Sequence, residues 1–200
     1  MSQNSQNNRI KEILDKSQKI LVVTRRLPTG DSLGSMLALG LVLEKMNKEI
    51  NLVCHGPISS TFSFLPKRKD ISSELKSARN FVIKLDTSKA KVSQFSYDFD
   101  ADGNFLNIYI TPESGNYDAN QFSARAGGYE YDLIFIVDCP DLELLGPVYN
   151  KSAELFYNTP IINIDHDRAN AQYGEVNLVD HEATSTAEVL YRFIESLDKK

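Results

Sequence analysis

Three apolar stretches of the sequence each end in residues that could bind a metal ion. Asp31 follows the first stretch and Asp138 the second, and Asp165 and His166 follow the third. Carboxylates together with an imidazole suit a divalent cation such as Mn²⁺ or Mg²⁺. Such a cation polarises a phosphoryl group and supplies hydroxide for hydrolysis. These residue types therefore predict a site for phosphate chemistry, provided that the fold brings the three stretches together.

Each of these aspartates also has a simpler interpretation, as the cap of the helix that follows it. Asp31 stands at the start of a helical pattern over residues 32–46. An aspartate is favoured there without any metal, because its carboxylate accepts from the unpaired backbone N–H groups of the first turn. Taken singly, each aspartate is better explained as a cap, and only the combination with His166 favours a common site.

The elements that must position these residues are alternating strands and helices. Buried strand patterns that alternate with helical patterns predict an α/β fold with a largely parallel sheet flanked by helices. The carboxyl ends of parallel strands share one edge of the sheet, which is where ligands bind in such folds. We expect strands at residues 19–24, 49–54, 81–85, 132–137 and 160–164, and helices at 9–17, 32–46 and 183–197.

A different pattern interrupts this alternation. Residues 92–99 and 105–111 alternate between apolar and polar side chains around an Asp-Gly turn, which predicts an antiparallel β-hairpin. We therefore expect a single α/β domain over residues 9–198, with a hairpin inserted at about 91–111. Residues 1–8 are rich in Gln, Asn and Ser, and we expect them to form a disordered tail.

The composition excludes several classes of function. The chain has 22 Lys and Arg against 27 Asp and Glu, a net charge of −5, which argues against non-specific coating of nucleic acid. A nucleotide or a short oligonucleotide at one site remains compatible with this charge. No apolar run is long enough to span a membrane and the N-terminus is polar, so we expect a cytoplasmic protein with no membrane partner. Residues 86–150 hold 3 basic against 11 acidic residues, which makes the hairpin region acidic.

The order of the motifs resembles that of the DHH family of phosphoesterases. The motifs are Pro-Thr-Gly-Asp-Ser-Leu-Gly-Ser at 28–35, Val-Asp-Cys-Pro-Asp at 137–141, Ile-Asp-His-Asp at 164–167 and Ser-Thr-Ala-Glu at 185–188. The resemblance covers most of residues 18–195 and is nearest to the nano-RNase and pAp phosphatase type. It implies the N-terminal domain of that family, which hydrolyses phosphate esters or anhydrides at a two-metal Mn²⁺ centre.

The resemblance also assigns roles to individual residues. It makes Asp31, Asp138 and His166 metal ligands. The supporting positions are Asp165, Gly34 and Ser35. A further ligand of the family lies on a strand that this sequence does not reach, and we expect the family's C-terminal substrate-binding domain to be absent.

Three positions depart from the family pattern. Arg25 stands where the family has its first His, Thr29 where it has its first Asp, and Asp167 where it has the second His of the name-giving motif. Arginine cannot coordinate a metal, and we hypothesise that Arg25 pairs with Asp31 or Asp138 in place of the cation. A carboxylate at Asp167 would repel a phosphoryl oxygen. All three changes predict a degenerate metal site.

The sequence therefore leaves three functions from different classes. The first is a DHH homologue with little or no hydrolase activity, a pseudoenzyme that binds a nucleotide or a partner protein with Mn²⁺, Mg²⁺ or no metal. The second is an active Mn²⁺-dependent phosphoesterase acting on short oligoribonucleotides or pAp. The third is a non-catalytic interaction module that uses the acidic region 86–132. The three substitutions favour the first function.

Overall fold

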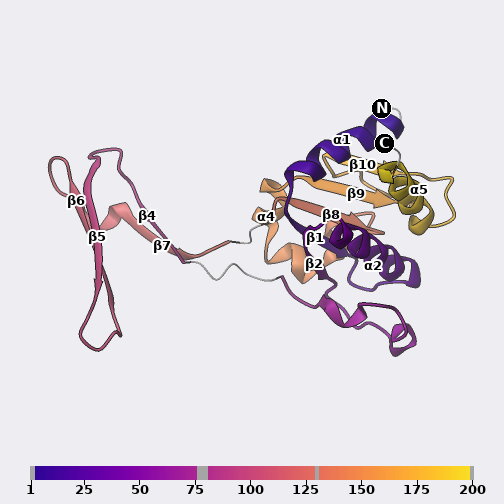
Figure 1. The fold of residues 1–200 in the computed structure, drawn as a ribbon, viewed down its shortest axis with the longest axis horizontal. Coiled ribbons are helices and arrows are strands. Elements are labelled where there is room, and N and C mark those ends of the chain that lie inside the picture. The colour runs from indigo at the N-terminus through magenta and orange to yellow at the C-terminus, as the bar shows by residue number, and fades with distance from the viewer. Residues whose placement is uncertain (1–2, 76–80, 129–130, 199–200) are drawn as a thin grey trace. The chain divides into compact units, whose positions relative to one another are not determined.

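The chain forms two compact units. The computed structural model describes residues 3–75, 81–128 and 131–198. An α/β unit is built from Met1–Ser77 and Tyr129–Lys200, and an inserted unit from Ala78–Gly128 (Figure 1). The insertion is larger than the hairpin that the sequence predicts. It forms a compact unit of its own, whereas the sequence analysis expects a single domain.

The α/β unit is built on a six-stranded parallel sheet, as the sequence predicts. The strand order is β10-β9-β8-β1-β2-β3, and every pairing is parallel. Strands β8 and β9 are buried along their whole length because both faces of the sheet are covered, which explains their uninterrupted apolar sequences. The strands span Lys19–Thr24 (β1), Glu49–Val53 (β2), Ile71–Ser72 (β3), Leu133–Val137 (β8), Ile161–Asp165 (β9) and Val176–Val179 (β10).

Helices cover both faces of this sheet. Ile20 and Val22 of β1 pack into a core with α1, α2 and α5, whereas Leu21 and Val23 face a second core with α3 and α4. This alternation follows from the period of two along a strand. None of the described helices is long and apolar enough to cross a membrane. The helices span Gln3–Lys16 (α1), Gly30–Lys45 (α2), Pro147–Asn150 (α3), Ala153–Asn158 (α4) and Thr186–Asp198 (α5).

The prediction of a disordered tail at residues 1–8 is wrong for residues 3–8, because α1 begins at Gln3; residues 1–2 lie outside the described residues. Ile10 and Leu14 on the same helix are buried in the core. The side chain of Gln6 donates a hydrogen bond of 2.8 Å to the backbone carbonyl of Asn177 in β10. These tertiary contacts stabilise a segment whose composition alone indicates disorder.

The inserted unit contains two antiparallel pairs of strands. Strand β5 (Val92–Phe99) pairs with β6 (Leu106–Pro112), which confirms the predicted hairpin. In its turn Gly103 has a φ of 70°, a left-handed conformation that glycine adopts without strain. Strand β4 (Phe81–Leu85) pairs with β7 (Phe122–Ala126), so the expectation that 81–85 joins the parallel sheet is wrong. None of its residues is buried, unlike those of β8 and β9, which is typical of an antiparallel strand that faces water.

Candidate metal centre

Asp31, Asp138 and His166 meet at the carboxyl edge of the parallel sheet. They follow three adjacent strands: Asp31 lies in the first turn of α2 after β1, Asp138 directly follows β8, and His166 directly follows β9. One ligand atom from each residue lies within 4.8 Å of the others. Nε2 of His166 is 3.7 Å from Oδ2 of Asp31. The structure therefore brings together the three residues that the sequence singles out.

Asp138 is a buried carboxylate held by hydroxyl groups. Only 6% of the residue is exposed, and its φ of 52° is a left-handed conformation that aspartate and asparagine tolerate. Oδ1 accepts a hydrogen bond from Thr186 (3.0 Å), and Oδ2 accepts from Thr29 (3.2 Å) and from Ser32. Burial raises the pKa of Asp138, the bonds from Ser32 and Thr186 oppose this rise, and two neighbouring carboxylates add to it.

Asp31 does not cap the helix in which it lies, contrary to the simpler interpretation of the sequence. Thr29 is the N-cap of α2 and forms a capping box with Ser32. The carboxylate of Asp31 instead accepts from the backbone N–H groups of Thr186 (2.7 Å) and Ala187 (2.9 Å), at the start of α5. The Ser35 hydroxyl also donates to Asp31 (3.2 Å). Asp31 therefore links α5 to α2 across the site.

Replacing Asp31 by alanine should lower the free energy of unfolding of the metal-free protein by about 1–2 kcal/mol, because two N–H groups at the start of α5 lose their acceptor. Urea denaturation of metal-stripped protein measures the change. Asp15→Ala is the matched control, since Asp15 is exposed near the end of α1 and should change stability by less than about 0.5 kcal/mol. Equal effects of the two variants would contradict the capping role.

A buried polar network positions His166. Asp165 is fully buried and accepts from the backbone N–H groups of His166 (2.7 Å) and Asp167 (3.1 Å). The amide of Asn170 donates to the other oxygen of Asp165 (2.7 Å), and Asn170 in turn bonds to Asn163. Asp165 therefore fixes the backbone after β9, and its supporting role at a metal site stays a prediction.

The three substituted positions also have defined contacts. The hypothesis that Arg25 pairs with Asp31 or Asp138 is wrong: within the described residues these carboxylates bind hydroxyls, backbone N–H groups and His166. The Thr29 hydroxyl is used in capping α2 and in bonding Asp138. The carboxylate of Asp167 accepts from the backbone N–H of Ala169 (2.8 Å), as in an Asx-turn.

The donor set of this cluster fits a divalent cation. Among the described residues, no Lys or Arg forms an ion pair with Asp31, Asp138 or Asp165, so the negative charge of the cluster has no cationic partner except His166 when that ring is protonated. A carboxylate offers about four acceptor positions, and protein donors occupy three on Asp31 and three on Asp138. One position therefore remains on each carboxylate, beside an imidazole nitrogen.

The hydroxyls around Asp138 are the part of the site that the sequence does not identify. Ser32 and Thr186 look like ordinary residues at helix starts, and both are fully buried. The only feature of the sequence that could have pointed to Ser32 and Thr186 is that each is a hydroxyl residue beside a predicted helix start. Gly34, a supporting position by resemblance, faces open space where a Cβ would stand, so no steric contact requires glycine there.

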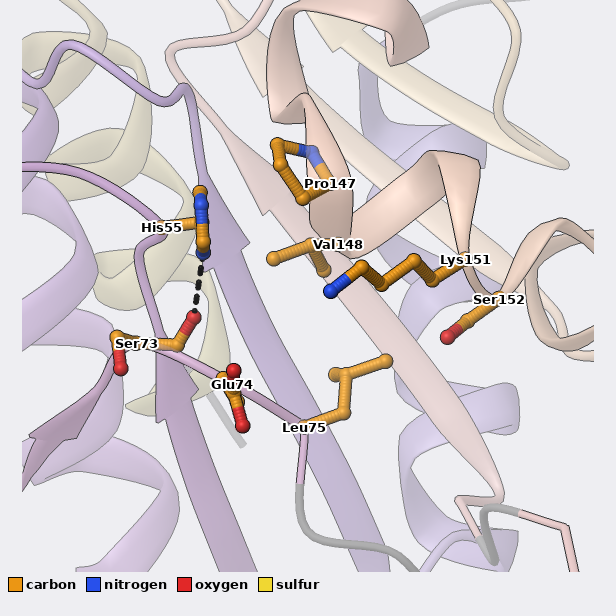
Figure 2. Close-up of a pocket in the computed structure, with 8 residues that line it drawn as sticks. All are labelled: His55, Ser73, Glu74, Leu75, Pro147, Val148, Lys151 and Ser152. Atoms are coloured by element: carbon orange, nitrogen blue, oxygen red, sulfur yellow. Dashed lines mark hydrogen bonds between the residues drawn. The ribbon is translucent and has the colours of Figure 1, made fainter.

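The other histidines lie outside this cluster. His181 is exposed just before α5. His55 follows β2 and lines a separate pocket of about 120 Å³, beside Ser73, Glu74 and Lys151 (Figure 2). Its Nδ1 is 3.0 Å from the backbone carbonyl of Ser73.

Comparison with known proteins identifies the family. No curated protein matches the chain. Its fold is similar to the crystal structure of an exopolyphosphatase-related protein from Bacteroides fragilis, with a TM-score of 0.63 and 16% sequence identity. The alignment covers 99% of this chain but 46% of that one, so the chain spans less than half the length of this relative. The model of the DHH family N-terminal domain matches residues 19–200, and the chain therefore belongs to the DHH family, as a phosphoesterase-like domain.

Proposed function

We propose that this domain binds one divalent cation, Mn²⁺ or Mg²⁺, at Asp31, Asp138 and His166, and holds a nucleotide or short oligonucleotide there with little or no hydrolysis. The observation that carries the proposal is the approach of three ligand atoms to within 4.8 Å, among carboxylates that no described Lys or Arg neutralises. Two carboxylates and one imidazole form a donor set that suits these cations.

The substituted positions support one cation in place of two. Two-metal hydrolysis needs ions roughly 3.5–4 Å apart, each with its own protein ligands. Arg25 offers no lone pair to a metal, and the Thr29 hydroxyl is already committed to capping α2 and bonding Asp138. The described residues therefore provide one set of three ligands, for one ion, and no second set.

The chain's own residues then favour binding over turnover. A cation at this site would neutralise phosphoryl oxygens and orient them. A buried hydrogen bond from Thr186 holds Asp138 in place, and Asp165 holds the backbone at His166. The carboxylate of Asp167 lies one residue beyond His166 and opposes the growth of negative charge on a phosphoryl group during hydrolysis, which disfavours turnover. These features support retention of a phosphorylated ligand with slow chemistry.

Calorimetric titration of the metal-stripped protein with Mn²⁺ tests the proposal. We expect a stoichiometry near one, and at least about 10-fold weaker binding in His166→Ala, the level typical for loss of a metal-site group. His181→Ala is the matched control, because that histidine is exposed outside the cluster. Assays with pAp and dinucleotides should show little turnover. Two sites with rapid hydrolysis would instead establish the active phosphoesterase, and no binding would refute the metal site.

A further inference from the structure

The hairpin of β5 and β6 has one face made only of apolar side chains. Cross-strand pairing and the alternation of side chains place six residues on this face, and the rings of Tyr97 and Phe99 are in edge-to-face contact at 6.3 Å. The opposite face holds polar pairs such as Asp98 with Asn107, whose side chains share a hydrogen bond of 2.9 Å. The six apolar residues are Phe95, Tyr97, Phe99, Leu106, Ile108 and Ile110.

Within the inserted unit, no other described segment covers this apolar face. Phe95, Tyr97 and Phe99 are 61%, 63% and 62% exposed, and Leu106 is 52% exposed. An isolated two-stranded sheet is at best marginally stable in water and needs a covering layer on its apolar face. A contiguous exposed apolar patch of this size marks an interaction surface.

The charges along the hairpin differ between its two ends. The tip carries Asp98, Asp100 and Asp102 without a basic residue. At the base, Lys89 and Lys91 lie beside Asp86 and Glu113, so this end is close to neutral. The acidic tip would repel the phosphates of nucleic acid or of an anionic lipid surface. The same polarity suits a partner that presents these charges in the reverse order.

We propose that this face binds the same face of a second copy of the chain, with the two hairpins antiparallel. Such an interface is self-complementary about a two-fold axis, as in most homodimers. The antiparallel arrangement places the acidic tip of each copy against the nearly neutral, lysine-bearing base of the other. The two apolar faces then form a small sheet-on-sheet core.

The exposed area is sufficient for a modest dimer. With aromatic side chains that bury about 150–250 Å² each, the observed exposures imply that roughly 500 Å² of apolar surface would be covered on each copy. The total of about 1,000 Å² lies below the roughly 1,200–2,000 Å² of stable interfaces and is typical of weak, reversible ones. We therefore expect a dimer that dissociates in the micromolar range. This inference is independent of the proposed metal site.

Sedimentation equilibrium of the full chain over a range of concentrations tests the dimer. Tyr97→Lys places a charge in the centre of the apolar face and should weaken dimerisation at least 10-fold. Ser96→Lys, the adjacent residue on the polar face, is the matched control and should change it less than 3-fold. A monomer at every concentration, or equal effects of the two variants, would overturn the proposal. His166→Ala should dimerise like the parent, which separates this result from that of the metal site.

Disulfide trapping tests the orientation. The native cysteines, Cys54 and Cys139, are buried and should stay unreactive. A mixture of the Asp100→Cys and Lys91→Cys variants should give a cross-linked heterodimer under mild oxidation, because the tip of one copy meets the base of the other. Strand β5 has 8 residues, or about 26 Å, so each variant alone should cross-link poorly. Preferential cross-linking of each variant with itself would overturn the antiparallel arrangement.

Discussion

Changing Arg25→His, Thr29→Asp and Asp167→His together should create a second Mn²⁺ site and raise phosphoesterase turnover by at least about 100-fold. The three changes supply an imidazole, a carboxylate and a second imidazole at the positions where the sequence departs from the resemblance to the DHH motifs. Thr29→Asp should preserve α2, because aspartate is also a favoured N-cap. Calorimetry measures the stoichiometry, and hydrolysis of pAp and dinucleotides measures the turnover.

The single variant Asp167→His is the control for the triple variant. It restores one imidazole but leaves Arg25 and Thr29 in place, so its Mn²⁺ stoichiometry should stay near one. The metal-free triple variant should melt at a lower temperature than the parent, because Thr29→Asp adds a carboxylate beside Asp138. If the triple variant binds no more Mn²⁺ than the parent, these three positions do not belong to a second metal site.

Asp138→Asn should stabilise the metal-free protein and remove its response to Mn²⁺. The change replaces a buried charge by a neutral amide of nearly the same shape, and asparagine tolerates the left-handed φ of 52°. We expect a gain of about 1 kcal/mol at neutral pH, or roughly 2–4 °C in melting temperature for a chain of this size. Mn²⁺ should raise the melting temperature of the parent but not of the variant. Destabilisation of the metal-free variant would contradict this account of Asp138.

The pH dependence of stability provides a second measure of the same residue. The pKa of Asp138 is raised above 3.8 by folding, so just above that pH the folded protein binds more protons than the unfolded chain. The contribution of Asp138 to stability is therefore fully present below about pH 3.8 and is lost as pH rises through the raised pKa. Asp132, whose pKa is lowered by backbone hydrogen bonds, acts in the opposite direction. The difference in free energy of unfolding between the parent and Asp138→Asn, measured across pH 4–7, reports the contribution of Asp138 alone. This difference should grow as pH rises.

The sequence by itself determined the parallel sheet and the convergence of the cluster. Strands β1, β8 and β9 are short apolar runs, and their burial on both faces makes them recognisable from local pattern. Once these strands are parallel and adjacent, the residues that follow them must share one edge of the sheet. Asp31, Asp138 and His166 could therefore be placed together without any coordinates.

Only the tertiary structure decided what each of those residues contacts. Three of the donors to Asp31 and Asp138 come from the start of α5, more than 40 residues along the chain from Asp138. No local pattern therefore reports the bonds from Thr186 and Ala187. A contact between distant segments also explains why α1 is helical from its start: Gln6 donates a hydrogen bond to the backbone of Asn177 in β10. Local pattern does reveal the β5–β6 hairpin, because alternation shows which side chains share a face. Alternation does not show whether another layer covers that face, so the exposure of its apolar side chains is known only from the structure.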